Sequence, residues 1–217
     1  MAQHQKGIEI TERKARGHDL VPSGGIEIKY DSQPVNRVYK ASGYVYLVVD
    51  CSGSMAGDKL LQATRGALNF AKDALAKNYL TGVIQFHSSS KLICELGKDI
   101  RALEKKLNNI ELGDTTHMAD AIRLAHKKLK DMTGNLAMVI VTDGMPNGPE
   151  DPQATLTAGK MAKNNGIDII TIGTDDADYA FLKQLASRSE LSTKVSRDNL
   201  AKAIESASKL LPAPKNT

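Results

Sequence analysis

The chain has 217 residues, which is long enough for one full hydrophobic core with a short remainder. Its formal net charge is +4, from 29 basic and 25 acidic residues spread along the chain, and aromatic residues make up only 4%. Nucleic-acid-binding proteins usually combine clustered Lys and Arg with aromatic platforms. The composition therefore argues against nucleic acid as a partner.

The first ten residues lack the apolar core of a secretory signal, and no apolar run approaches the roughly 20 residues of a membrane helix. We therefore expect a soluble, cytoplasmic protein with no membrane partner. The two cysteines, Cys51 and Cys94, are far apart and have no second Cys or His at ligand spacing. We expect reduced, buried thiols and no zinc site.

Residues 1–42 differ from the rest of the chain. The tetrapeptide GIEI occurs at 7–10 and again at 25–28, separated by a polar, basic stretch. Isoleucines at alternate positions are typical of short strands, so an N-terminal extension with two short strands is one interpretation. A chance repeat in a flexible extension explains the same pattern, and both interpretations stay open.

From residue 43 onward, short apolar runs alternate with longer segments of helical period. The predicted strands are 44–49, 82–86, 91–96, 136–141, 166–173 and 191–195. The predicted helices are 57–78, a short one from residue 99, 118–129, 152–165, 178–188 and 198–211. Only residues 87–90 link the second strand to the third, which is too short for a crossover helix, so these two strands should pair antiparallel.

This alternation favours an α/β fold, a three-layer, doubly wound, mainly parallel sheet with one antiparallel edge strand at 91–96. We predict one such domain over residues 43–211 and a disordered tail at 212–217. In such sheets the ligand crevice lies at the carboxyl ends of the strands, where the strand order reverses. Asp50 and Asp143 both follow predicted strands and should lie at that edge.

Two carboxylates at one sheet edge repel each other unless a proton or a cation separates them. The segment DCSGS at 50–54 places Asp50, Ser52 and Ser54 at alternate positions of a tight loop, where their oxygens can point to one centre. Mg²⁺ prefers such oxygen ligands. The sequence predicts a magnesium site, and its shortage of carboxylates argues against a tight Ca²⁺ cage, although Mn²⁺ and Ca²⁺ remain alternatives.

Three segments carry a resemblance to a known family: DCSGS at 50–54, TTHMADAI at 115–122 and VTDG at 141–144. In order and in predicted position they resemble the metal-ion-dependent adhesion site, or MIDAS, of von Willebrand factor type A (VWA) domains. The resemblance covers about residues 43–211 and implies a Rossmann-like VWA fold with a complete MIDAS. The metal ligands that it implies are Asp50, Ser52, Ser54, Thr116 and Asp143.

One position of this resemblance involves a choice between two threonines. The family threonine is commonly followed by a small or polar residue, an apolar residue and a helix, which favours Thr116 over Thr115. His117 departs from the asparagine, proline or small residue that is common at that place. We therefore interpret His117 as an exposed residue at the start of the helix, or as a residue that touches the bound partner.

The resemblance implies a module without catalytic activity, which holds Mg²⁺ and captures an Asp or Glu side chain of a partner protein. We place Met55, His117 and Gly144 at the partner-binding rim, and Gly144 also serves the turn after its strand. Intracellular, prokaryotic-like members of the family often work beside AAA+ ATPases, metal chelatases or stress systems such as tellurium resistance. No residue of this sequence selects among them.

Two other functions stay open. Asp50 at the end of a strand is similar to the nucleophile of haloacid dehalogenase-type phosphoester hydrolases. In those enzymes a second Asp lies two residues later, and Ser52 stands here instead, which removes the general acid. The other alternative is a scaffold that binds a metal only for stability.

Two further segments receive structural interpretations. GSMAGDK at 53–59 lies between a strand and a helix but fails the phosphate-loop pattern, because Leu60 follows Lys59 where that pattern needs Ser or Thr. Asp175, Asp176 and Asp178 are interpreted as a solvated loop and the start of a helix, where acidic side chains are favourable.

Overall fold

The structure is a computed structural model that describes residues 10–12, 26–28, 41–147 and 152–212. The chain forms two compact units, Met1–Tyr39 and Lys40–Thr217. In the first unit, β1 (Ile10–Glu12) pairs antiparallel with β2 (Ile26–Ile28). The other residues of the predicted extension up to residue 40, and residues 213–217 of the predicted tail, lie outside the described residues.

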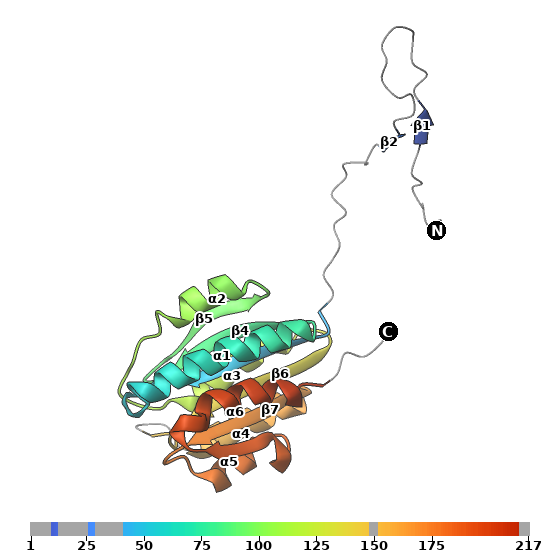
Figure 1. Cartoon of the computed structure of the whole chain (residues 1–217). Coiled ribbons are helices and arrows are strands. Elements are labelled where there is room, and N and C mark those ends of the chain that lie inside the picture. Colours follow the sequence, from blue (N-terminus) through green and yellow to red (C-terminus); the bar gives the residue numbers. More distant parts are fainter. Residues whose placement is uncertain (1–9, 13–25, 29–40, 148–151, 213–217) are drawn as a thin grey trace. The chain divides into compact units, whose positions relative to one another are not determined.

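The second unit is built on a six-stranded sheet with the order β5-β4-β3-β6-β7-β8 (Figure 1). Strand β5 pairs antiparallel with β4 and forms one edge, and all the other neighbours are parallel. This confirms the predicted sheet with an antiparallel edge strand. The strands are β3 (Gly43–Asp50), β4 (Tyr79–Phe86), β5 (Ser90–Gly97), β6 (Asn135–Thr142), β7 (Ile167–Thr174) and β8 (Ser192–Val195).

The helices cover both faces of the sheet, as predicted for a three-layer α/β fold (Figure 1). One face carries α1 (Asp58–Ala76), α2 (Ile100–Leu107) and α6 (Leu200–Ala207). The other face carries α3 (Met118–Leu129), α4 (Pro152–Asn164) and α5 (Tyr179–Leu185). Short 3₁₀ turns lie at Gly53–Met55, Ser189–Leu191, Arg197–Asn199 and Ser208–Leu210.

Both layers of core come from the alternation of side chains along the strands. In β3, Val45, Leu47 and Val49 pack toward α1, whereas Tyr46 and Val48 pack toward α3. All five are at most 1% exposed. A strand buried on both faces reads as a continuous apolar run, and this explains why β3 has no polar residue before Asp50.

Helices α1 and α6 lie side by side on the sheet (Figure 1) and approach each other closely at Gly66. A Cβ atom at Gly66 would lie 2.8 Å from the carbonyl oxygen of Ala201. The absence of a side chain at this position therefore sets the distance between the two helices.

The strand order reverses between β3 and β6. From β3 the sheet continues in one direction to β4 and β5, and in the other to β6, β7 and β8. Asp50 ends β3, and Asp143 directly follows β6. The two aspartates therefore lie at the carboxyl ends of neighbouring strands, where an open α/β sheet forms its ligand crevice.

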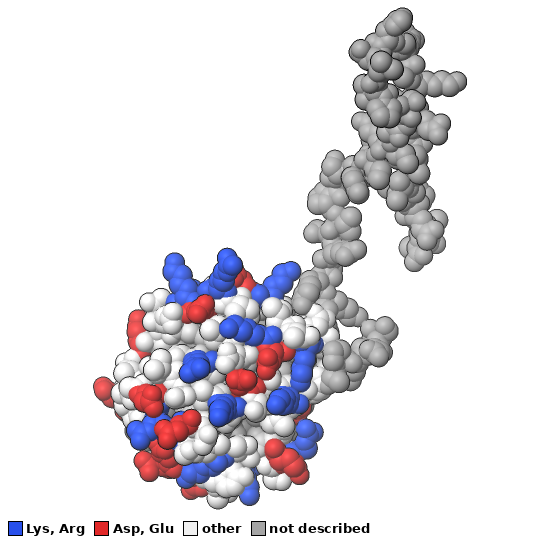
Figure 2. Space-filling view, in the orientation of Figure 1, with Lys and Arg blue, Asp and Glu red and all other residues white. Residues whose placement is uncertain are grey.

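The surface charges in Figure 2 are mixed, and neither of the two cysteines forms a disulfide. On the face drawn in Figure 2, basic and acidic side chains are interspersed. Cys51 and Cys94 are both free thiols, the first buried and the second half-buried. Among the described residues, no helix has both the length and the apolar character needed to cross a membrane.

Candidate metal centre

Asp50 is the anchor of the candidate site. Its side chain is 0% exposed, and both of its carboxylate oxygens accept hydrogen bonds. The Ser52 backbone N–H donates to Oδ1 at 2.8 Å, and the Thr142 hydroxyl donates to Oδ2 at 2.6 Å. The carboxylate is thus held between the loop after β3 and the last residue of β6.

Burial raises the pKa of Asp50 to about 6, and the negative charge of Asp143 adds to this rise. The hydrogen bonds from Thr142 and Ser52 lower the pKa and only partly oppose the effect. A buried carboxylate with a raised pKa is stabilised in its charged form by a nearby cation. The environment of Asp50 therefore favours a positive charge at this edge of the sheet.

The two serines after β3 form a chain of oxygens that leads to Asp143. The 3₁₀ turn Gly53–Met55 begins after Ser52 and brings the hydroxyl of Ser54 back toward it. The two Oγ atoms are 3.1 Å apart. The Ser54 hydroxyl then donates to Oδ1 of Asp143 at 2.7 Å, which joins residues that are 89 positions apart.

Thr116 lies in a loop that runs beside the serines. Gly113 in this loop pairs with Ser52, and the Gly113 N–H donates to the Cys51 carbonyl at 2.9 Å. Thr116 itself is 2% exposed and is held by Asn147. Its backbone N–H donates to Oδ1 of Asn147 at 3.0 Å, and the Asn147 side-chain amide donates to the Thr116 hydroxyl at 3.4 Å.

The structure links four of the predicted ligands by hydrogen bonds among themselves, namely Asp50, Ser52, Ser54 and Asp143. The fifth, Thr116, belongs to the neighbouring loop, and its hydroxyl contacts Asn147.

The three predicted rim residues differ in how exposed they are. Met55 is 0% exposed and packs in the core under α1, so its prediction as a partner-binding residue is wrong. The 3₁₀ turn that brings Ser54 toward Asp143 directs the next side chain into the protein. Gly144 is partly exposed, with nothing within 4 Å of an added Cβ. His117 is half-buried, and its Nε2 atom has no hydrogen-bond partner in the described part of the chain.

Lys59 is the most important residue that the sequence analysis missed. Its ammonium group donates to Oδ2 of Asp143 at 2.6 Å and lies 3.3 Å from Oδ2 of Asp175. Burial lowers the pKa of Lys59, but the two carboxylates outweigh burial and raise it. A signal existed in the sequence, because Lys59 lies in the first turn of a predicted helix at the same sheet edge as two predicted carboxylates.

Thr142 and Asn147 were also missed, since each contacts a proposed ligand, Asp50 or Thr116, that is distant in sequence. Asp175 was interpreted as part of a solvated loop. Its carboxylate is 30% exposed but is paired with Lys59.

The donor set fits a small, hard cation. Octahedral Mg²⁺ with bonds of about 2.1 Å places neighbouring ligand oxygens about 3.0 Å apart. The Ser52–Ser54 and Ser54–Asp143 oxygen pairs are 3.1 and 2.7 Å apart. In the described ranges, no group of three or more His, Cys, Asp or Glu side chains could hold a metal, so the serine hydroxyls are essential to this candidate.

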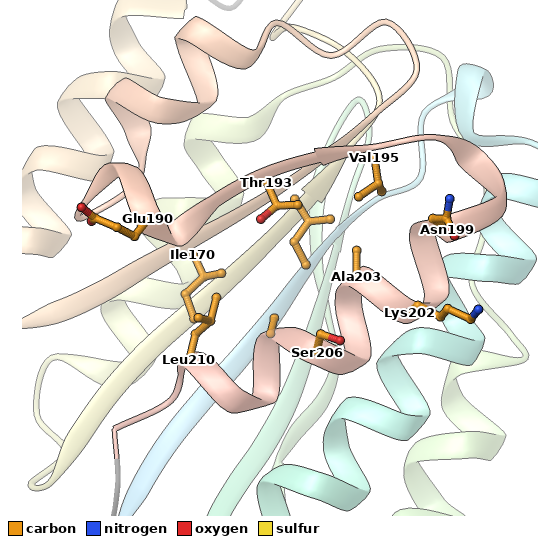
Figure 3. Close-up of a pocket in the computed structure, with 11 residues that line it drawn as sticks. Ile170, Glu190, Thr193, Val195, Asn199, Lys202, Ala203, Ser206 and Leu210 are labelled. Atoms are coloured by element: carbon orange, nitrogen blue, oxygen red, sulfur yellow. The ribbon is translucent and has the colours of Figure 1, made fainter.

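A cavity lies elsewhere, between α6 and the strands β7 and β8 (Figure 3). Its volume is about 360 Å³, and Ile170 and Leu210 contribute to its apolar wall. Its polar lining includes Glu190 and Lys202. None of the residues that line this cavity belongs to the candidate metal centre.

A family model of the von Willebrand factor type A domain matches residues 45–209. The chain belongs to this family. Curated relatives of the VWA chain include UPF0353 proteins of Mycobacterium ulcerans and Mycobacterium tuberculosis, which are 26% identical over 153 residues. The match covers 63% of this chain and 45% of each relative, so the chain matches less than half of the length of these proteins.

Solved structures of other proteins share the fold. The vWF domain of the type V pili tip protein Mfa5 from Porphyromonas gingivalis superposes with a TM-score of 0.70 at 15% identity, covering 82% of this chain and 98% of that one. BatB from Bacteroides thetaiotaomicron gives 0.65 at 18% identity, with 77% and 97% covered. The pilus adhesin SpaC from Lactobacillus rhamnosus GG gives 0.67 at 17% identity, with 78% and 30% covered.

Proposed function

We propose that this VWA domain is a metal-dependent protein-binding module without catalytic activity. Asp50, Ser52, Ser54, Thr116 and Asp143 would hold Mg²⁺, and an Asp or Glu side chain of a partner protein would complete the site. The observation that carries the proposal is the chain of oxygens from Ser52 through Ser54 to Asp143, whose spacing suits an octahedral cation.

The chemistry of the ligands determines what such a site does. Bound Mg²⁺ would supply a Lewis-acidic position that attracts a carboxylate. The hydroxyls of Ser52, Ser54 and Thr116 are neutral, so they would coordinate the cation without neutralising its charge. Only Asp50 and Asp143 carry negative charge, and Lys59 already balances part of the charge of Asp143. A partner carboxylate is therefore the missing anion in this proposal.

The surroundings of the site support access by a partner. Ser54 is exposed, and Gly144 leaves open space beside Asp143. Two of the structural neighbours are described as a pilus adhesin and a pili tip protein, which is consistent with a role in protein binding. The proposal extends to the expectation of a cytoplasmic partner such as an AAA+ ATPase or a stress-response protein.

The phosphoester hydrolase alternative has less support. In enzymes of that type a second Asp two residues after the nucleophile acts as the general acid. Ser52 stands at that position here, so a leaving group would receive no proton from it. No comparison with known proteins favours a hydrolase either.

Titration calorimetry with Mg²⁺ and Mn²⁺ tests the proposal. Wild-type protein should bind one ion, and the Ser54→Ala and Asp143→Asn variants should lose that binding. Ser189→Ala is the matched control, because Ser189 is an exposed serine in the turn that precedes β8. No heat of binding in the wild type with either ion would contradict the metal site.

A second experiment separates partner binding from a purely structural metal. Proteins captured by the immobilised domain should be retained in Mg²⁺, released by EDTA and absent with Ser54→Ala. Metal binding without any Mg²⁺-dependent capture would favour the scaffold alternative. Turnover of a phosphatase substrate that depends on Asp50 would favour the hydrolase.

A further inference from the structure

Lys59 links the start of α1 to two loops at the carboxyl edge of the sheet. It belongs to the first turn of α1, whereas Asp143 follows β6 and Asp175 follows β7. Its ammonium nitrogen lies 2.6 Å from Oδ2 of Asp143 and 3.3 Å from Oδ2 of Asp175. The Lys59 side chain is only 14% exposed, so these carboxylates replace much of its hydration.

The bond to Asp143 places Lys59 against the proposed metal site. Asp143 uses Oδ1 to accept from Ser54 and Oδ2 to accept from Lys59. Its side chain is 1% exposed, so water screens the charges around it only weakly. A divalent cation beside Asp143 would therefore be repelled by the ammonium group of Lys59.

Asp175 offers Lys59 a second partner that is not one of the proposed metal ligands. Its backbone has φ of +47°, in the left-handed region that residues other than glycine, asparagine and aspartate rarely adopt. Its carboxylate is 30% exposed and is not bonded to any of the proposed metal ligands. Lys59 can thus remain paired even if its bond to Asp143 is lost.

We propose that Lys59 is an internal cation that competes with the divalent metal for Asp143. Asp175 is the alternative partner that takes up Lys59 when Asp143 turns to the metal. This inference rests on the proposed function, because it concerns the occupancy of the same site. The Lys59–Asp143–Asp175 arrangement then sets the Mg²⁺ concentration at which the domain becomes able to bind its partner.

Mg²⁺ affinity measured by calorimetry tests the role of Lys59. Lys59→Met keeps the aliphatic part of the side chain and removes the charge, so it should bind Mg²⁺ about tenfold more tightly than the wild type. Lys59→Arg keeps the charge and should stay close to the wild type. The matched control is Lys128→Met, because Lys128 forms an equally short ion pair, 2.6 Å to Glu95, that involves none of the proposed ligands.

The role of Asp175 is tested by Asp175→Asn. Asparagine tolerates the left-handed backbone of this position, so the loop conformation should be preserved. With its alternative partner lost, Lys59 should hold Asp143 more firmly, and Mg²⁺ should bind about threefold more weakly. In the Lys59→Met background the same change should have almost no effect. An equal weakening in both backgrounds would show that Asp175 acts only through its charge, and would overturn its role as a partner.

The outcomes separate this inference from the proposed function. If the wild type binds Mg²⁺ and Lys59→Met binds it equally or more weakly, competition by Lys59 is wrong while the metal site stands. If only Lys59→Met binds Mg²⁺, Lys59 excludes the metal from the wild type, so the competition is supported while the proposed function of the wild-type domain fails. If neither protein binds, although circular dichroism shows both to be folded, the metal site and the competition fail together.

Discussion

The Thr142 hydroxyl donates a 2.6 Å hydrogen bond to Oδ2 of Asp50, and both side chains are 0% exposed. This bond joins the last residues of β6 and β3, which are 92 positions apart. It therefore crosses the place where the strand order reverses and fixes one carboxylate of the candidate site to the sheet itself.

Replacing Thr142 with valine should destabilise the protein, because valine has nearly the same shape but cannot donate to the buried carboxylate. We expect a loss of about 1–3 kcal/mol in the free energy of unfolding, the usual cost of an unsatisfied buried group. Urea denaturation at pH 7 in EDTA measures it. The control is Thr155→Val, because the buried Thr155 hydroxyl has no hydrogen-bond partner in the described residues. Equal effects of the two changes would contradict a special role for Thr142.

Asp50 should make the metal-free protein less stable as the pH rises from about 4 to about 6. Burial raises its pKa from the ordinary 3.8 to about 6, so in this window the folded protein holds a proton that the unfolded chain has released. The stabilisation by this proton is complete below the pKa of Asp50 in the unfolded chain. It is lost as the pH rises through the pKa of Asp50 in the folded protein, by about 3 kcal/mol in total.

Unfolding by urea in EDTA at several pH values measures this effect. Asp50→Asn is the reference, since asparagine does not titrate and the carboxylates that do not interact with Asp50 contribute equally to both proteins. The difference in unfolding free energy between wild type and variant should fall across the window. A difference that does not change with pH would show that Asp50 titrates normally.

Asn147 should be needed for full metal affinity, because it holds the backbone and the hydroxyl of Thr116. Asn147→Ala would leave Thr116 less well oriented, and we expect Mg²⁺ binding to weaken by about tenfold, the lower end of the usual range for residues that support metal ligands. Asn165→Ala is the control, since Asn165 also bonds through its side chain but to Met161 at the end of α4. If calorimetry shows that Asn147→Ala binds Mg²⁺ with unchanged affinity, the loop orients Thr116 without help from Asn147.

Gly66→Ala should destabilise the fold although alanine favours a helix over glycine by about 1 kcal/mol. The added Cβ would lie 2.8 Å from the Ala201 carbonyl oxygen, a backbone atom that cannot move without shifting α6. Overpacking of this kind costs typically about 1–3 kcal/mol, and thermal unfolding would reveal it. Gly144→Ala should be nearly neutral, since its Cβ would meet nothing within 4 Å. A stabilised Gly66→Ala protein would show that α1 and α6 separate freely.

Much of the fold was predictable because its signals are local. Buried strands read as apolar runs, and the strand predicted at 44–49 lies within β3 at 43–50. The four residues 87–90 were enough to predict the antiparallel pairing of β4 with β5, because no crossover fits in so short a link. Neighbouring residues can still mislead, as Met55 shows, since its position beside Ser54 says nothing of the direction in which a 3₁₀ turn points it.

The sequence by itself determined the secondary structure, the α/β class and the identity of the oxygen-bearing residues at the strand ends. Only the tertiary structure decided that Lys59 pairs with Asp143 and Asp175, and that Thr142 bonds to Asp50. These contacts depend on the strand order β4-β3-β6-β7, which brings together loops that are distant in the chain. The sequence does not show which partner a charged group or a hydroxyl will contact, because the energy of that interaction depends on the distance between the two groups and on their burial.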